Sequence, residues 1–258
     1  MLERILFHKR QEVAERTSRR PLSELAAAAK NAGPIRPFSA AVRRDNGPVR
    51  LIAEIKRASP SRGLLCRRFS APDLARAYTD GGAAAISVLT DKAFFRGDLA
   101  FVREVKRVSP LPVLQKDFIV DPYQVYEARV VGADAVLLIV AALEGNILPE
   151  LLELASDLGL AALVEVHCAA ELERALEAGA DLVGINNRDL RTFRTDLSVT
   201  ESLVKLIPPG VVVVSESGLK CAADVRRVAE AGVDAVLVGE ALVTSNDAAA
   251  KLRELVGA

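Results

Sequence analysis

The chain has 258 residues, with 34 basic and 34 acidic side chains and a hydrophobic fraction of 50%. This neutral composition is typical of a soluble globular protein and excludes disorder, collagen-like repeats and a disulfide scaffold. Zero net charge and 4% aromatic residues provide neither the basic surface nor the stacking platform that nucleic-acid binding requires.

The sequence also indicates where the protein resides. Its N-terminus has no continuous apolar region of the kind found in signal peptides. The longest apolar stretch, residues 135–143, is about half the ~18 residues that a membrane span needs. Cys66, Cys168 and Cys221 lie far apart without CxxC spacing, so we expect reduced thiols. We therefore expect a cytoplasmic protein with no membrane partner.

Residues 1–48 precede the first predicted strand. Their pattern is largely amphipathic and helical, interrupted by Pro34, Pro37 and Gly47. We predict an N-terminal helical extension that acts as a cap rather than as a second domain.

A recurring phrase, a glycine followed by an apolar run, begins at Gly81, Gly132, Gly179 and Gly232. The glycine is typical of a helix end, and the run after it lacks the polar alternation of a half-exposed strand. Strands without that alternation are covered on both faces, as in parallel sheets. Four further runs of this kind bring the predicted strands to eight: residues 50–55, 112–115, 161–166 and 211–214.

A helical segment follows each predicted strand, and several of these segments begin with Asp or Asn. They cover residues 71–82, 98–109, 121–132, 146–159, 169–179, 196–207, 222–232 and 247–256. Eight strand–helix units predict a single (β/α)8 TIM barrel over residues 49–258. An open doubly wound sheet is the alternative, but the first strand continues into AEIKRASPSRG, which lacks the GxGxxG pattern of that fold.

The active site of such a barrel lies at the carboxyl ends of its strands. Two glutamates and two lysines end predicted strands there: Glu54, Lys56, Lys116 and Glu165. Neighbouring charges and desolvation shift pKa values, so this set can donate and remove protons. The alternative for each residue alone is a solvated loop position or a surface salt bridge.

The last two strands end in small residues, Ser217-Gly218 and Gly239-Glu240. Barrels often bind phosphate at these two loops through backbone N–H groups, and glycine permits the close approach. We predict a phosphate site there, with ordinary turn chemistry as the alternative. The histidines, His8 and His167, form no metal-ligand spacing, and no GxSxG elbow is present. A structural hydrogen bond is the favoured reading of His167.

Several blocks in order, IAEIKRASPSRG, LQKDF, LVEVH, GINNRDL, VSESG and VGEAL, carry a family resemblance. Over essentially its whole length the chain resembles the indole-3-glycerol-phosphate synthases of tryptophan biosynthesis. The resemblance implies a carboxy-lyase reaction: 1-(2-carboxyphenylamino)-1-deoxyribulose 5-phosphate closes its second ring and loses carbon dioxide and water. It also implies that no metal or organic cofactor takes part, and that the N-terminal extension covers the barrel mouth.

The resemblance further implies roles for individual residues. Lys116 is the expected acid and Glu165 the expected base, and we expect Lys56 and burial together to lower the pKa of Lys116. The implied catalytic set is Glu54, Lys56, Lys116, Glu165, Asn186 and Ser217. The implied substrate-binding set is Ser59, Pro60, Leu89, Phe95, Phe118, Leu137, Arg188, Gly218, Gly239 and Glu240, with the aromatic residues forming the slot for the substrate ring.

Two alternatives remain open. Other phosphate-binding barrel isomerases depend on Asp/Cys or Asp/Asp pairs, whereas the first strand here ends in Glu-Ile-Lys. A catalytically silent metabolite-binding barrel would have lost an acid or a base, and both are present. One departure from the family pattern is the charge that Arg96 and Asp98 add to the loop after the second predicted strand. We expect a phosphorylated small-molecule substrate and a monomer or weak homodimer.

Overall fold

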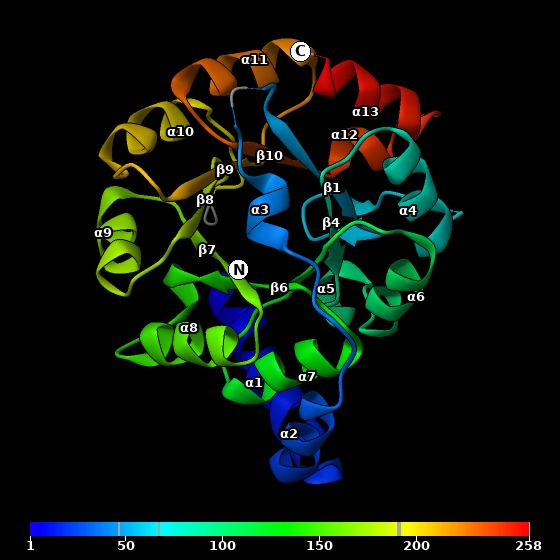
Figure 1. The fold of residues 1–258 in the computed structure, drawn as a ribbon, viewed down its shortest axis with the longest axis vertical. Helices are drawn as coiled ribbons and strands as arrows, with labels where there is room; N and C mark the ends of the chain where they lie inside the picture. Colours follow the sequence, from blue (N-terminus) through cyan, green and yellow to red (C-terminus); the bar gives the residue numbers. More distant parts are fainter. Residues whose placement is uncertain (46, 67, 190–191, 258) are drawn as a thin grey trace.

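The computed structural model describes residues 1–45, 47–66, 68–189 and 192–257. Leu190 of the GINNRDL block and Ala258 at the predicted end of the barrel therefore lie outside the described residues. Eight parallel strands close into a barrel in the order β1-β10-β9-β8-β7-β6-β5-β4, as seen end-on in Figure 1. The predicted (β/α)8 barrel is confirmed. Its strands are β1 Arg50–Ile55, β4 Ala85–Leu89, β5 Val113–Lys116, β6 Ala135–Ile139, β7 Ala161–Val166, β8 Leu182–Asn186, β9 Val212–Glu216 and β10 Ala235–Val238.

Eight helices surround the barrel and bury their apolar faces against it (Figure 1). They are α4 Ala71–Asp80, α6 Ala100–Val108, α7 Pro122–Val131, α8 Ile147–Asp157, α9 Ala169–Glu177, α10 Ser198–Leu203, α11 Ala222–Ala231 and α13 Ala248–Val256. Asp121 and Asp247 cap α7 and α13 by accepting backbone N–H groups. Gly132 and Gly232 end α7 and α11 with φ of 91° and 106°, the left-handed backbone expected of a helix-ending glycine.

Short elements in the loops were not predicted, because two to four residues carry no readable periodicity. The hairpin of β2 Ala58–Ser59 and β3 Gly63–Leu64 follows β1, and α5 Lys92–Phe95 follows β4. The others are η1 Val140–Ala142, η2 Val204–Leu206 and α12 Glu240–Val243.

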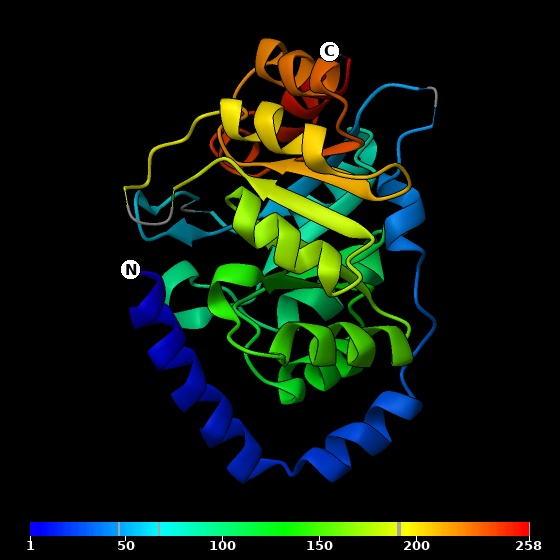
Figure 2. The same ribbon diagram turned by 90° about the vertical axis from the view of Figure 1, so that its left-hand side faces the viewer.

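The N-terminal extension reaches both ends of the barrel (Figure 2). Helix α1 Leu2–Arg19 runs down the side where the carboxyl ends of the strands lie, and α2 Leu22–Lys30 packs against α7. The chain then returns along the opposite side, where α3 Phe38–Val42 lies across the centre of the ring. Phe38 and Val42 are buried among inward-facing strand residues. The N-terminal extension thus also packs against the amino end of the barrel.

Two aspartates of the recurring glycine phrase hold the returning segment at the amino end. Asp134 accepts the backbone N–H of Arg36 at 2.7 Å and that of Val113 at 2.7 Å. Asp234 accepts the backbone N–H of Arg44 at 2.9 Å in the same way. The returning segment is therefore attached to the amino end of the barrel through its own backbone N–H groups. Among the described residues no helix has the length and apolarity to cross a membrane.

Candidate active site

A cavity of about 180 Å³ lies at the carboxyl ends of the strands. Its lining includes every residue of the two sets that the family resemblance implies, and the roles of these residues remain predictions. Lining residues outside those sets come from the N-terminal helix and from the strand ends and loops: Met1, Leu2, Ile5, Ser61, Asp117, Ile139, Phe193, Glu216, Leu219, Leu237 and Val238.

The polar residues at the mouth continue the inward-facing rows of the strands. Because strand side chains alternate between faces, Leu114 in the barrel interior is followed two positions later by Lys116, and Leu163 by Glu165. The same step leads from Ile52 to Glu54 and from Val214 to Glu216. These four charged residues stand on alternate strands around the ring, β1, β5, β7 and β9, which is how four side chains share one layer of such a barrel.

Lys116 is paired with two carboxylates, one from β7 and one from β9. Its Nζ lies 3.1 Å from Glu165 Oε2 and 3.1 Å from Glu216 Oε2, and these two side chains are only 3% and 2% exposed. Burial alone would lower the pKa of Lys116, but Glu165, Glu216 and Glu54 raise it above its ordinary value. The expectation that Lys56 and burial together would lower this pKa is therefore wrong, because the three carboxylates outweigh burial. Lys56 itself pairs with Glu54 at 2.6 Å.

Glu165 is surrounded by hydrogen-bond donors. Besides Lys116, it faces Asn186, whose Nδ2 donates to Oε1 at 3.0 Å, and His167, whose Nε2 lies 3.3 Å from the same oxygen. Burial would raise the pKa of Glu165, but Lys116 and His167 outweigh it and lower the pKa. The carboxylate is therefore ionised and able to accept a proton.

His167 has a partner on its other side as well. Its Nδ1 lies 3.0 Å from Glu171 Oε2, which also accepts the His167 backbone N–H at 2.7 Å. Burial opposes protonation, yet the hydrogen bonds with Glu165 and Glu171 raise the pKa of His167 to about 10. The hydrogen bond with Glu171 is the structural one expected from the sequence. On its other side the same imidazole ring faces Glu165, the candidate base.

Glu216 is absent from the predicted catalytic and binding sets. Burial, only partly offset by Lys116, raises its pKa to about 7. The alternation along VVVSE was a signal for it, since Val212 and Val214 face the barrel interior. A second signal is Gly184 on the adjacent strand, where a Cβ would overlap the Glu216 carboxylate. Gly239 makes room for Glu54 in the same way.

One side of the cavity is apolar and aromatic. The rings of Phe95 and Phe118 lie 6.0 Å apart between centroids. Leu89 and Leu137 from the strands complete this wall, together with Ile5 of α1. A flat aromatic ring fits such a wall.

The opposite side is built by the loops after β9 and β10. Ser217 and Gly218 both have left-handed backbone, with φ of 66° and 82°, and strain of this kind in a non-glycine residue is typical of functional sites. Glu240 pairs with Arg62 at 3.0 Å and lies 4.0 Å from Arg188. The expected phosphate site is therefore bordered by the guanidinium groups of Arg62 and Arg188 and by the backbone N–H groups next to Gly218 and Gly239.

The charged loop after β4 turns its charges away from the cavity. Asp98 pairs with Lys92 at 3.0 Å and accepts the Ala100 backbone N–H at 2.9 Å, both near the surface. Arg96 ends α5 with φ of 53° and is exposed. Neither Arg96 nor Asp98 lines the cavity.

The other histidine and the cysteines considered in the sequence do not line the cavity. His8 stacks edge-to-face on Phe94, and the three cysteines are unpaired. Within the described ranges, no group of three or more His, Cys, Asp or Glu residues is arranged to hold a metal ion.

The fold resembles solved structures of phosphate-metabolite enzymes. The 3-hexulose-6-phosphate synthase from Salmonella typhimurium matches with a TM-score of 0.67 over 81% of this chain and 97% of that one, at 18% identity. The thiamine phosphate pyrophosphorylase from Pyrococcus furiosus matches with a TM-score of 0.61 over 80% and 93%, at 22% identity. At these identities the comparison supports the fold alone.

Sequence relatives are far closer. A protein of Roseiflexus castenholzii named indole-3-glycerol phosphate synthase is 52% identical over 100% of this chain and 98% of its own length. One of Dehalococcoides mccartyi with the same name is 51% identical over 99% and 100%. The family model described as indole-3-glycerol phosphate synthase matches residues 2–255. With the cavity and its charged layer, these matches show that the chain belongs to the indole-3-glycerol phosphate synthase family.

Proposed function

We propose that the protein converts 1-(2-carboxyphenylamino)-1-deoxyribulose 5-phosphate to indole-3-glycerol phosphate, carbon dioxide and water. The observation that carries this proposal is Lys116, held between Glu165 and Glu216 with an aromatic wall on one side and an arginine-bordered phosphate end on the other. A substrate with an aryl group at one end and a phosphate at the other would bring its central ketone to Lys116.

Lys116 serves as the acid of the ring closure. The ring carbon that bears the carboxylate attacks the ketone carbon, and the ketone oxygen takes a proton from Lys116 as the carbon–carbon bond forms. The raised pKa keeps the proton on Lys116 until a forming alkoxide, a stronger base than either carboxylate partner, comes within hydrogen-bond reach. Carbon dioxide then leaves, and its bonding electrons restore the aromatic ring.

Glu165 serves as the base of the dehydration. The new hydroxyl leaves as water after it takes a proton from a lysine at the mouth, Lys56 or the reprotonated Lys116. Glu165 removes a proton from the neighbouring carbon, so that the double bond of the five-membered ring forms. The lowered pKa of Glu165 leaves it ionised for this step, and Asn186 fixes its orientation. We assign Lys56, which pairs with Glu54, to binding the substrate carboxylate before it is lost.

The phosphate end is bound by the loops after β9 and β10. Arg188, Gly218 and Gly239 border it, and the phosphate competes with Glu240 for the guanidinium groups. We also propose a cytoplasmic location and a monomeric or weakly dimeric state. Cell fractionation and light scattering check these two points.

The test is the rise of indole fluorescence when the protein meets the carboxyphenylamino-deoxyribulose phosphate in metal-chelated buffer, with Lys116→Met as control. We expect signal from the unaltered protein and a kcat lower by about 10²–10⁴-fold in Lys116→Met, the usual contribution of a general acid. Calorimetry with indole-3-glycerol phosphate should show that the variant still binds. Binding without turnover in the unaltered protein would overturn the proposal in favour of a silent metabolite-binding barrel.

A further inference from the structure

Helix α1 buries one charged side chain among apolar ones. Its buried residues are Ile5, Leu6, Lys9 and Val13, and Lys9 is 0% exposed. Lys9 therefore occupies a position on this helix face that an apolar residue would fill if the contact served only to attach the helix. An ammonium group at such a position must be paired, because an unpaired buried charge is very costly.

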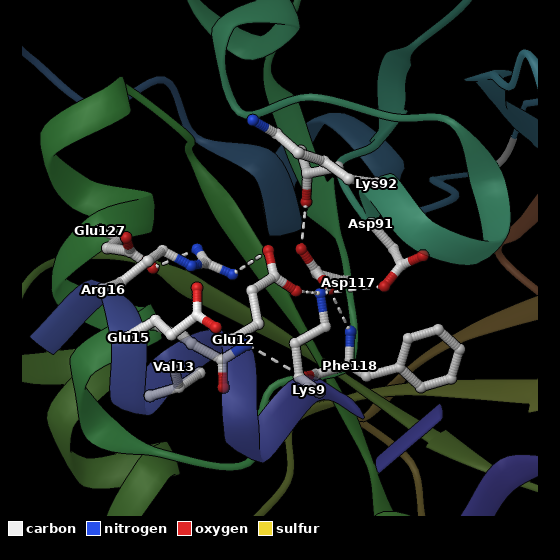
Figure 3. A network of polar contacts seen from close by, with 12 residues as sticks. Lys9, Glu12, Val13, Glu15, Arg16, Asp91, Lys92, Asp117, Phe118 and Glu127 are labelled. Atoms are coloured by element: carbon white, nitrogen blue, oxygen red, sulfur yellow. Dashed lines mark hydrogen bonds and ion pairs between the residues drawn. The ribbon is translucent and has the colours of Figure 1, made fainter. Parts of the chain in front are cut away.

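Three carboxylates surround the Lys9 ammonium (Figure 3). Its Nζ lies 2.8 Å from Glu12 Oε2, 2.9 Å from Asp91 Oδ2 and 2.8 Å from Asp117 Oδ1. Burial alone would lower the pKa of Lys9, but Asp117 and Asp91 raise it, so the charge persists throughout the working pH range. Asp91 and Asp117 belong to the barrel, so Lys9 joins the helix to two adjacent strand ends.

Each of these aspartates also sets the start of a loop that lines the cavity. Asp91 caps α5 by accepting the Phe94 backbone N–H at 2.7 Å, one residue before Phe95. Asp117 directly follows Lys116 and accepts the Phe118 backbone N–H at 2.8 Å. It also accepts the Thr90 hydroxyl at 2.6 Å, which ties the end of β4 to the end of β5. Of the two aromatic residues in the cavity wall, Phe118 is held directly by Asp117, and Phe95 follows Phe94, which Asp91 holds.

A second cation strengthens the attachment of the helix on its outer side. Arg16 pairs with Glu12 at 2.6 Å and with Glu127 of α7 at 2.7 Å. Figure 3 shows this chain of ion pairs running from α7 through α1 to the strand ends. Buried ion pairs of this kind are rarely more stabilising than apolar packing of the same volume, but removing one partner leaves the others unpaired. Such a cluster can specify one geometry without adding stability.

We propose that Lys9 is a positioning residue for the reaction: from the N-terminal helix it fixes Asp91 and Asp117, and through them the Phe95–Phe118 wall and the end of the strand that carries Lys116. The helix thereby contributes to turnover through one buried ammonium and not only by covering the cavity. The kinetic part of this inference rests on the proposed function.

The test is Lys9→Met, which keeps the length of the side chain and removes its charge. We expect kcat/KM to fall by about tenfold to a hundredfold, with both a higher KM and a lower kcat, because the aromatic wall and Lys116 lose their common support. The matched control is Arg10→Met on the exposed side of the same helix, for which both constants should stay unchanged. Lys9→Arg, which restores the charge, should recover part of the loss.

Hydrogen exchange gives a readout that needs no turnover. Amides in peptides covering residues 90–97 and 116–120 should exchange faster in Lys9→Met than in Arg10→Met, since Phe94 and Phe118 donate to the aspartates that lose their partner. If the unaltered protein forms no product, the function fails, but this measurement still tests the positioning. Should Lys9→Met not fold, Asp91→Asn is expected to show the same changes to a smaller degree. A lower Tm with unchanged kcat/KM and unchanged exchange would overturn the proposal.

Discussion

The two ends of the barrel both bury carboxylates, but they satisfy them differently. At the amino end Asp134 accepts two backbone N–H groups and pairs with Lys106 at 2.6 Å. At the mouth Glu165 and Glu216 have only side-chain donors, chiefly Lys116. A carboxylate bonded to the main chain is committed to the fold, whereas one paired with movable side chains can exchange those partners for a substrate.

The N-terminal extension also contacts the two ends of the barrel through different groups. At the amino end it contributes the apolar helix α3 and the backbone N–H groups of Arg36 and Arg44. At the mouth it contributes Lys9, a charge that meets the strand ends beside the cavity. Changes to carboxylates at the two ends should therefore separate activity from stability.

The largest expected effect is that of Glu165→Gln at the mouth. The amide keeps the shape of the side chain but cannot accept a proton, so we expect kcat to fall by about 10²–10⁴-fold while product binding is retained. Steady-state rates and calorimetry measure the two quantities. A kcat within tenfold of the unaltered protein would remove Glu165 from the role of base.

The corresponding change at the amino end is Asp134→Asn. One carboxylate oxygen becomes an N–H₂ group that cannot accept a backbone N–H, so the unfolding free energy should fall by about 2 kcal/mol with kcat nearly unchanged. Urea unfolding measures this loss. Asp181→Asn is the matched control, because Asp181 occupies the same place in the recurring glycine phrase but is exposed. Equal losses in the two variants would show that the Asp134 bonds do not carry the effect.

The third effect, which is graded over several pH units, is the pH dependence of stability contributed by His167. Its pKa is raised to about 10 from 6.5, so the protonated form is the one that the fold stabilises. The stability lost in His167→Gln should therefore be largest below pH of about 6.5, decline as the pH rises, and vanish above pH of about 10. Unfolding at several pH values compares this variant with His8→Gln, an exposed histidine. A loss independent of pH would mean that packing, not charge, is responsible.

Several features of the site were predictable because they depend on local pattern. The glycine phrases located four of the strands. Glu54, Lys116 and Glu165 end three of the other four predicted strands, where the side-chain alternation along each strand places them on the inward rows at the mouth. The family blocks then supplied roles for these residues. The short loop elements, such as α5 and the β2–β3 hairpin, were missed because their geometry depends on tertiary contacts, as in the Asp91 cap of α5.

By itself the sequence determined the eight strand–helix units, the barrel that their number predicts and most polar residues at its mouth, though not Glu216, since periodicity and chain order are local properties. Only the tertiary structure decided which charged side chains pair with one another. Lys116 and Glu165 are separated by 49 positions and meet at 3.1 Å because alternate strands bring their inward residues into one layer. The same closure reverses the expected pKa shift of Lys116, by placing three carboxylates around it, and buries Lys9 between two strand ends. Such shifts depend on distance and desolvation, which exist only once the barrel is closed and covered.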